Sequence, residues 1–181
     1  MATISKRARV LLGATCIAIV LAIGATVWPQ SPTLNITVTG QSMIRSDFRV
    51  HAPNEVATIL PLLKGDVIFT NFEATVIEKE QSTHDGRFLS PPEALDALKA
   101  LGFNLLALSD NHSFDLKVSG VQNTLREVKS RNIVHAGIGN NLEEAAAPGY
   151  LKTPKGTVAI VAMASPDCGG RIGHRRPAGR K

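Results

Sequence analysis

The chain has 181 residues, of which 44% are hydrophobic, and its formal net charge is +5. This length is enough for the core of one ordinary domain and leaves no room for a second. The positive charge does not indicate a nucleic-acid-binding protein, because the basic residues concentrate in residues 1–9 and 171–181. The middle of the chain is nearly balanced in charge, so we expect no nucleic-acid partner.

An apolar block at residues 10–28 contains no charged residue and follows Lys6, Arg7 and Arg9. A basic flank of this kind is typical of the cytoplasmic side of a membrane segment. The block is close to the roughly 20 residues that span a bilayer, whereas the apolar part of a secretory signal has about 7–15. We predict that residues 1–29 form an uncleaved membrane anchor with the rest of the chain on the extracytoplasmic side, or a signal peptide whose cleavage leaves a secreted or periplasmic protein.

Strand and helix patterns alternate through residues 30–165, which we interpret as one domain. Short β-branched or continuous apolar runs predict strands, and apolar residues at helical spacing predict helices. Ser90 precedes two prolines and is the predicted N-cap of one helix. This alternation favours a layered α/β domain whose sites lie at the carboxyl ends of the strands. The predicted strands are residues 34–39, 66–70, 103–108 and 132–136, and the predicted helices are residues 53–63, 91–100 and about 115–131.

The last predicted elements are two strands, residues 149–152 and 157–163, joined by a Thr-Pro-Lys-Gly turn. Residues 166–181 are rich in Gly, Pro and Arg and show no periodicity. Such a composition cannot add to a packed core. We interpret this stretch as an irregular basic tail, disordered or non-native.

Polar side chains follow two of the predicted strands, those at residues 66–70 and 103–108. Because the carboxyl ends of parallel strands meet at one edge of a sheet, we expect these side chains to lie close together. Carboxylate and amide oxygens suit a hard divalent cation, and a neighbouring His can transfer a proton. The first cluster contains Asn71 and Glu73, and the second contains Asp110, Asn111, His112 and Asp115.

Two segments, GDVIFTNFE at residues 65–73 and FNLLALSDNHSFD at residues 103–115, resemble signatures of the CapA family of capsule or poly-γ-glutamate biosynthesis proteins. The family is similar to the calcineurin-like metallophosphoesterases. The resemblance implies a layered metallophosphoesterase-like sheet with flanking helices. It runs from about Leu34 to Ser165 and stops before the later His-containing motifs of the family, so we expect only the N-terminal part of that domain, an incomplete sheet.

The same resemblance implies roles for individual residues. His112 would be the catalytic acid, and the metal pocket would contain Asn71, Glu73, Asn111 and Asp115. The implied cofactor is a divalent metal ion, such as manganese, magnesium, iron or zinc. Gln41 stands where the family commonly has Asp, and the loss of that carboxylate weakens cation binding. A two-metal site, a one-metal site and a metal-free site therefore all remain open.

The resemblance implies a CapA-like protein in the biosynthesis and export of an extracellular polymer, acting as a metal-dependent hydrolase or transferase. One alternative is a non-catalytic component that binds polymer or partner subunits in a membrane assembly, and another is an inactive truncated remnant. A further interpretation is an exported α/β domain of unrelated purpose whose polar residues only form turns. The implied partners are the membrane, capsule or polyglutamate synthesis subunits and an anionic polymer. Whether the chain is an enzyme is left open.

Overall fold

The computed structural model describes residues 32–79, 81 and 87–165. The chain divides into two units, Met1–Thr33 and Leu34–Lys181, and every helix and strand described lies in the second. Within the described residues, no helix is both long and apolar enough to cross a membrane. The predicted anchor or signal at residues 1–29 and the predicted tail at residues 166–181 lie outside the described part.

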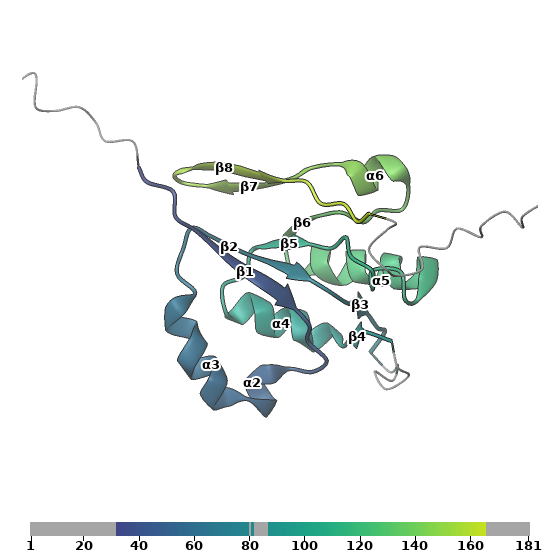
Figure 1. The fold of residues 1–181 in the computed structure, drawn as a ribbon, viewed down its shortest axis with the longest axis horizontal. Helices are drawn as coiled ribbons and strands as arrows, with labels where there is room; N and C mark the ends of the chain where they lie inside the picture. Colours follow the sequence, from purple (N-terminus) through teal and green to yellow (C-terminus); the bar gives the residue numbers. More distant parts are fainter. Residues whose placement is uncertain (1–31, 80, 82–86, 166–181) are drawn as a thin grey trace, which may run out of the picture. The chain divides into compact units, whose positions relative to one another are not determined.

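A four-stranded parallel sheet forms the centre of the second unit (Figure 1). Each strand pairs in parallel with its neighbours, and helices connect successive strands of this sheet. The α/β alternation predicted from the sequence is therefore confirmed. The strands, in spatial order, are β1 (Ile36–Ser42), β2 (Val67–Phe72), β5 (Leu105–Ala107) and β6 (Val134–Ala136).

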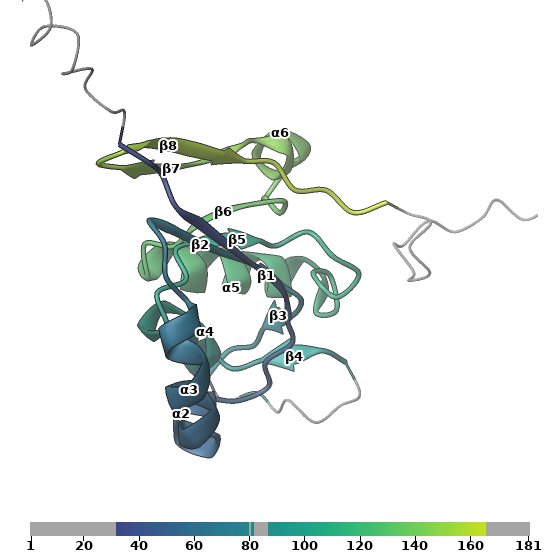
Figure 2. The same cartoon turned by 60° about the vertical axis from the view of Figure 1, so that its left-hand side comes forward.

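Helices α4 (Pro92–Ala100) and α5 (Lys117–Ser130) cover one face of this sheet, as Figures 1 and 2 both show. Alternate strand side chains point toward these helices, because successive residues of a strand face opposite sides. Full burial of one such aliphatic or aromatic side chain contributes about 1.5–3 kcal/mol. The core includes Ile68, Phe72 and Leu106 from the sheet and Leu95, Leu98 and Val128 from the helices.

The other face of the sheet carries a hairpin of β7 (Gly149–Thr153) and β8 (Gly156–Ile160), preceded by α6 (Leu142–Ala146) (Figures 1 and 2). Asn141 caps α6, since its side chain accepts a hydrogen bond from the Glu144 backbone at 2.9 Å. The hairpin was predicted, although its second strand ends at Ile160 and not at residue 163.

The connection between β1 and β2 is more helical than predicted. Before the predicted helix at residues 53–63 the chain forms a short helix, α2 (Phe48–His51), because the Asp47 carboxylate accepts a hydrogen bond from the Arg49 backbone at 3.0 Å and caps its start. Helix α3 (Pro53–Ile59) follows and tightens into the 3-10 turn η1 (Leu60–Leu62). Together these two elements occupy the predicted helix at residues 53–63.

The predicted N-cap at Ser90 is wrong. Ser90 belongs to β4 (Leu89–Ser90), which pairs in parallel with β3 (Thr75–Val76), and Pro91 is the N-cap of α4 without a side-chain bond. Ser90 is fully buried, and its hydroxyl donates to the Ile44 carbonyl. The hydroxyl is used in this tertiary contact, and Pro92 supplies the fixed backbone angle that starts the helix.

Candidate functional site

The carboxyl ends of β1, β2 and β5 lie side by side at one edge of the sheet. Gln41 is paired with Asn71, and Asn71 with Ala107. The Glu73 backbone donates to the Ser42 carbonyl at 3.3 Å, which ties the residues after β2 to the end of β1. The two polar clusters predicted from the sequence therefore meet here.

His112 lies between two carboxylates in this cluster. Its Nδ1 atom is 2.9 Å from Asp115 Oδ2, and its Nε2 atom is 4.0 Å from Glu73 Oε1. An ionised Asp115 accepts a hydrogen bond from Nδ1–H, which fixes the ring and leaves Nε2 to hold or accept a proton. The imidazole is partly exposed, whereas Glu73 is almost fully buried. The geometry fits a general acid or base whose second nitrogen faces the site.

Neighbouring backbone and hydroxyl groups hold the turn that carries His112. The hydroxyl of Thr75 in β3 donates to the His112 carbonyl at 2.5 Å, and the Phe88 backbone donates to Asp115 Oδ2 at 2.9 Å. The His112 backbone N–H donates to Asp110 Oδ1 at 2.7 Å. The short strands β3 and β4 thus position the site through residues far away in the sequence.

Among the described side chains, Glu73 Oε2 and Asp110 Oδ2 are buried oxygen atoms without a hydrogen-bond partner. Burial, as the largest cause, and the negative charge of Glu73 raise the pKa of Asp110, and hydrogen bonds from His112 and Ser113 lower it; the net result is a pKa of about 6. A buried carboxylate oxygen without a donor is costly, so this pair favours an added proton or cation. Asp110 was predicted as part of the cluster but without a role of its own; its position at a strand end was the available signal.

The residues present partly match a divalent cation site. The unpaired oxygens of Glu73 and Asp110 have the right chemistry, because hard cations prefer carboxylate oxygens. Within residues 32–79, 81 and 87–165, however, no three His, Cys, Asp or Glu side chains are grouped so as to hold a metal ion. Amide oxygens would have to complete the ligand set. The assignment of Asn71, Glu73, Asn111 and Asp115 as metal ligands remains a prediction.

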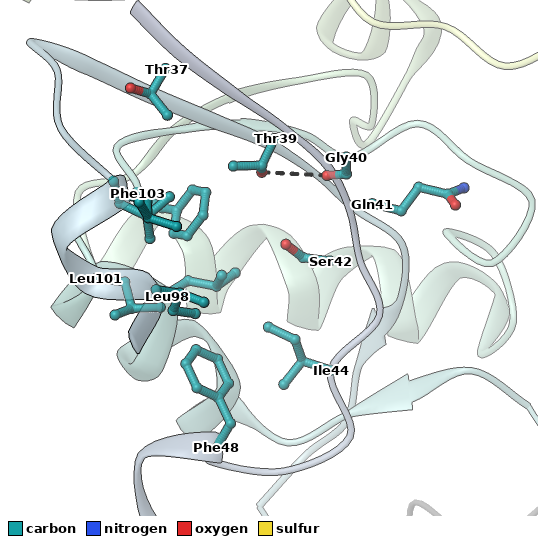
Figure 3. Close-up of a pocket in the computed structure, with 13 residues that line it drawn as sticks. Thr37, Thr39, Gly40, Gln41, Ser42, Ile44, Phe48, Leu98, Leu101 and Phe103 are labelled. Carbon is teal, nitrogen blue, oxygen red and sulfur yellow. Dashed lines mark hydrogen bonds between the residues drawn. The ribbon is translucent and has the colours of Figure 1, made fainter. Parts of the chain in front are cut away.

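A cavity of about 490 Å³ lies under β1 (Figure 3), and Gln41 and Ser42 at the carboxyl end of that strand belong to its lining. Its lining is uncharged and largely apolar, and Figure 3 shows the Gln41 side chain pointing away from the apolar group. An anionic or phosphorylated group has no charged partner there. The residues that form its apolar wall include Ile44, Phe48, Leu98, Leu101 and Phe103.

Comparisons with known proteins show which family the chain is similar to. A family model described as "Bacterial capsule synthesis protein PGA_cap" matches residues 35–179. The match extends past Ser165, where we expected the resemblance to stop. The uncharacterized protein y4sH of Sinorhizobium fredii is 33% identical over 64% of this chain and 26% of its own length. The capsule biosynthesis protein CapA of Bacillus anthracis is 23% identical over 75% of this chain and 36% of its own length.

The chain therefore spans about a quarter to a third of the curated relatives it matches. The family model, by contrast, covers most of the chain and includes both polar clusters. The predicted membership in the CapA group of capsule proteins is confirmed. This chain belongs to the family of bacterial capsule synthesis proteins, PGA_cap.

Proposed function

We propose that the chain takes part in capsule biosynthesis as a metal-assisted hydrolase or transferase that acts on an anionic extracellular polymer. The family match and the similarity to CapA support the capsule role. The observation that carries the catalytic part is the position of His112, with Asp115 on Nδ1 at 2.9 Å and Glu73 facing Nε2 at 4.0 Å. A histidine in this setting can transfer a proton in hydrolysis or in group transfer.

In this proposal water, or an acceptor group in a transfer, attacks the phosphoryl or acyl centre, the bond to the leaving oxygen or nitrogen breaks, and His112 gives that leaving atom a proton from Nε2. The Asp115 carboxylate stabilises the protonated ring and keeps Nδ1–H pointed at itself. Acid catalysis of this kind contributes about 10²–10⁴-fold to a rate. A divalent cation such as manganese, magnesium, iron or zinc, held by Glu73 and Asp110 with the amides of Asn71 and Asn111, would polarise the phosphoryl or acyl group under attack.

The setting of the reaction is also part of the proposal. The apolar block at residues 10–28 and its basic flank support a membrane-anchored protein with this domain on the extracytoplasmic side. Its partners would be the membrane, other subunits for capsule or polyglutamate synthesis, and the anionic polymer itself. The similarity to a capsule biosynthesis protein is what suggests partners in capsule synthesis.

The test uses the full chain, a phosphodiester reporter and a labelled anionic polymer, with and without manganese or magnesium. His112→Asn should reduce metal-dependent turnover at least about 100-fold if the ring is the acid. His135→Asn is the matched control, because His135 is a partly buried histidine within β6 whose Nδ1 lies 3.1 Å from the Ile133 carbonyl. Equal turnover by the two variants would exclude the role of His112.

A second candidate function is a polymer-binding or partner-binding component without turnover. Gln41 supports it, because the end of β1 contributes an exposed amide opposite Asn71 and so adds no carboxylate to the ligand set. This candidate predicts polymer binding by the wild type with no metal-dependent hydrolysis. Turnover that depends on His112 would rule it out.

A further inference from the structure

Arg45 lies in the loop after β1 and stacks on an aromatic ring beside His112. Its guanidinium carbon is 4.5 Å from the centroid of the Phe88 ring. The same ring is 5.4 Å from the His112 ring, centroid to centroid, at an interplanar angle of 47°. A single phenyl ring therefore connects a cation with the imidazole of the site.

The guanidinium of Arg45 is available to a ligand. The residue is exposed, and among the described residues no carboxylate lies within ion-pair distance of it. Arg49, four residues later, is by contrast held by Asp47 with a contact of 2.6 Å. A guanidinium whose carbon lies over a ring keeps N–H donors of its planar fork for a ligand, and these match the two oxygens of a carboxylate or phosphate.

The loop that carries Arg45 is fixed on both sides. The Ile44 carbonyl accepts a hydrogen bond from the buried Ser90 hydroxyl, and Asp47 caps helix α2. An ordered side chain on an ordered loop loses less freedom when it binds, so its contacts contribute more to affinity. The ring of Phe88 is held in turn by its backbone bond to Asp115.

The negative charge around His112 favours a cation at the position of Arg45. Glu73 and Asp115 place carboxylates on both sides of the His112 ring, and their negative charge disfavours an anionic substrate. A cation at the edge of the site offsets that repulsion without taking part in proton transfer by His112. The stacked guanidinium is such a cation.

We propose that Arg45, stacked on Phe88, forms an anion subsite beside His112 that takes a carboxylate or phosphate group of a polymeric substrate. The inference rests on the proposed function, because it names the substrate class of the same site. It assigns Arg45 to binding and specificity and leaves proton transfer to His112. A substrate without a neighbouring anionic group loses this contact.

The test measures binding without turnover, so it is independent of catalysis. A fluorescein-labelled poly-γ-glutamate oligomer is titrated with the full chain and followed by anisotropy, and inorganic phosphate is titrated as a competitor. The variants are Arg45→Gln, Arg45→Lys and the matched control Arg49→Gln, which removes the same charge from the same segment away from the ring. Thermal unfolding of each variant checks that the fold is kept.

We expect Arg45→Gln to weaken oligomer binding by about tenfold or more, as the loss of a charge-assisted bidentate contact implies. Arg45→Lys should bind between this variant and the wild type, because lysine keeps the charge but not the planar donor pair. Arg49→Gln should stay within about twofold of the wild type. If phosphate binds in an Arg45-dependent manner and the oligomer does not, the subsite is assigned to a phosphate-bearing substrate. If the oligomer binds in an Arg45-dependent manner, the subsite is assigned to a polycarboxylate.

The inference is overturned if Arg45→Gln and Arg49→Gln bind alike, or if the wild type binds neither probe. These results differ from a failure of the proposed function. If binding depends on Arg45 but no variant or condition gives turnover, the subsite stands and the catalytic proposal fails. If turnover depends on His112 but not on Arg45, the catalytic proposal stands and the subsite fails.

Discussion

Replacement of Asp110 by Asn should stabilise the protein at neutral pH. Burial raises the pKa of Asp110 from 3.8 to about 6, so the folded protein holds this proton more tightly than the unfolded chain between those values. Stability contributed by this group is therefore fully present below about pH 4 and is lost as pH rises to about 6. The rise in pKa corresponds to at most about 3 kcal/mol, and water at the partly exposed side chain reduces it to ~1–2 kcal/mol.

The assay is urea unfolding of the full chain at pH 4, 5, 6 and 7 with a metal chelator present. Asp110→Asn removes the charge but keeps an oxygen that can accept from the His112 backbone, so the variant should gain ~1–2 kcal/mol at pH 7 and little at pH 4. Asp96→Asn is a control of opposite sign, because the hydrogen bond from Arg131 lowers the pKa of Asp96; it should destabilise at pH 7 and less at low pH. Equal effects of Asp110→Asn at pH 4 and pH 7 would refute the reasoning.

Three further substitutions test the scaffold and the acid–base pair. Gly137→Ala should lower the free energy of unfolding in urea by about 2–4 kcal/mol, because Gly137 has φ +111° and a Cβ would lie 2.6 Å from the Ser109 Cβ. Gly40→Ala is the control: no atom lies within 4 Å of the added Cβ, so stability should change by less than ~1 kcal/mol. Equal losses in the two variants would contradict this reasoning. Thr124→Val should lower the free energy of unfolding by ~1–3 kcal/mol in the same assay, since Thr124 Oγ1 accepts a hydrogen bond from the buried Val76 N–H at 2.9 Å. An unchanged urea midpoint would contradict this and show that the Val76 N–H finds another acceptor. Asp115→Asn should lower turnover by about 10–100-fold in the reporter assay with the fold retained, because the imidazole loses its charged partner; full activity would remove Asp115 from the mechanism.

Local sequence patterns were sufficient for the parallel sheet and for its polar edge. The continuous apolar runs that became β2 and β5 are long enough to identify as strands, and the polar residues that follow them marked the carboxyl end of the sheet. The rule that such ends meet at one edge then brought Glu73 and His112 together. These inferences needed only the spacing of apolar residues and the order of the elements along the chain.

The contacts that tune the site were beyond sequence patterns. Strands β3 and β4 have two residues each, too short for any period, yet Thr75 and Phe88 hold the His112 turn through bonds that cross 37 and 27 positions. Ser90 had the sequence context of a helix cap, and burial beside Ile44 gave it a different partner. Tertiary packing decided both outcomes, and local propensity cannot anticipate it.

The stacking of Arg45 on Phe88 belongs to the same class of features. The two residues are far apart in the chain, and neither stands in a motif singled out from the sequence. Only the positions of β1 and β4 bring the guanidinium over the ring next to His112. The charge pattern of the sequence does not single out Arg45.

Capsule production in the organism that encodes this chain tests the central claim most directly. The gene is deleted and replaced with the wild type, His112→Asn or His135→Asn, and the cell-bound polymer is measured at equal protein levels. Our account predicts that the wild type and His135→Asn restore the polymer and that His112→Asn does not. Full restoration by His112→Asn would contradict a catalytic role for this site in capsule biosynthesis.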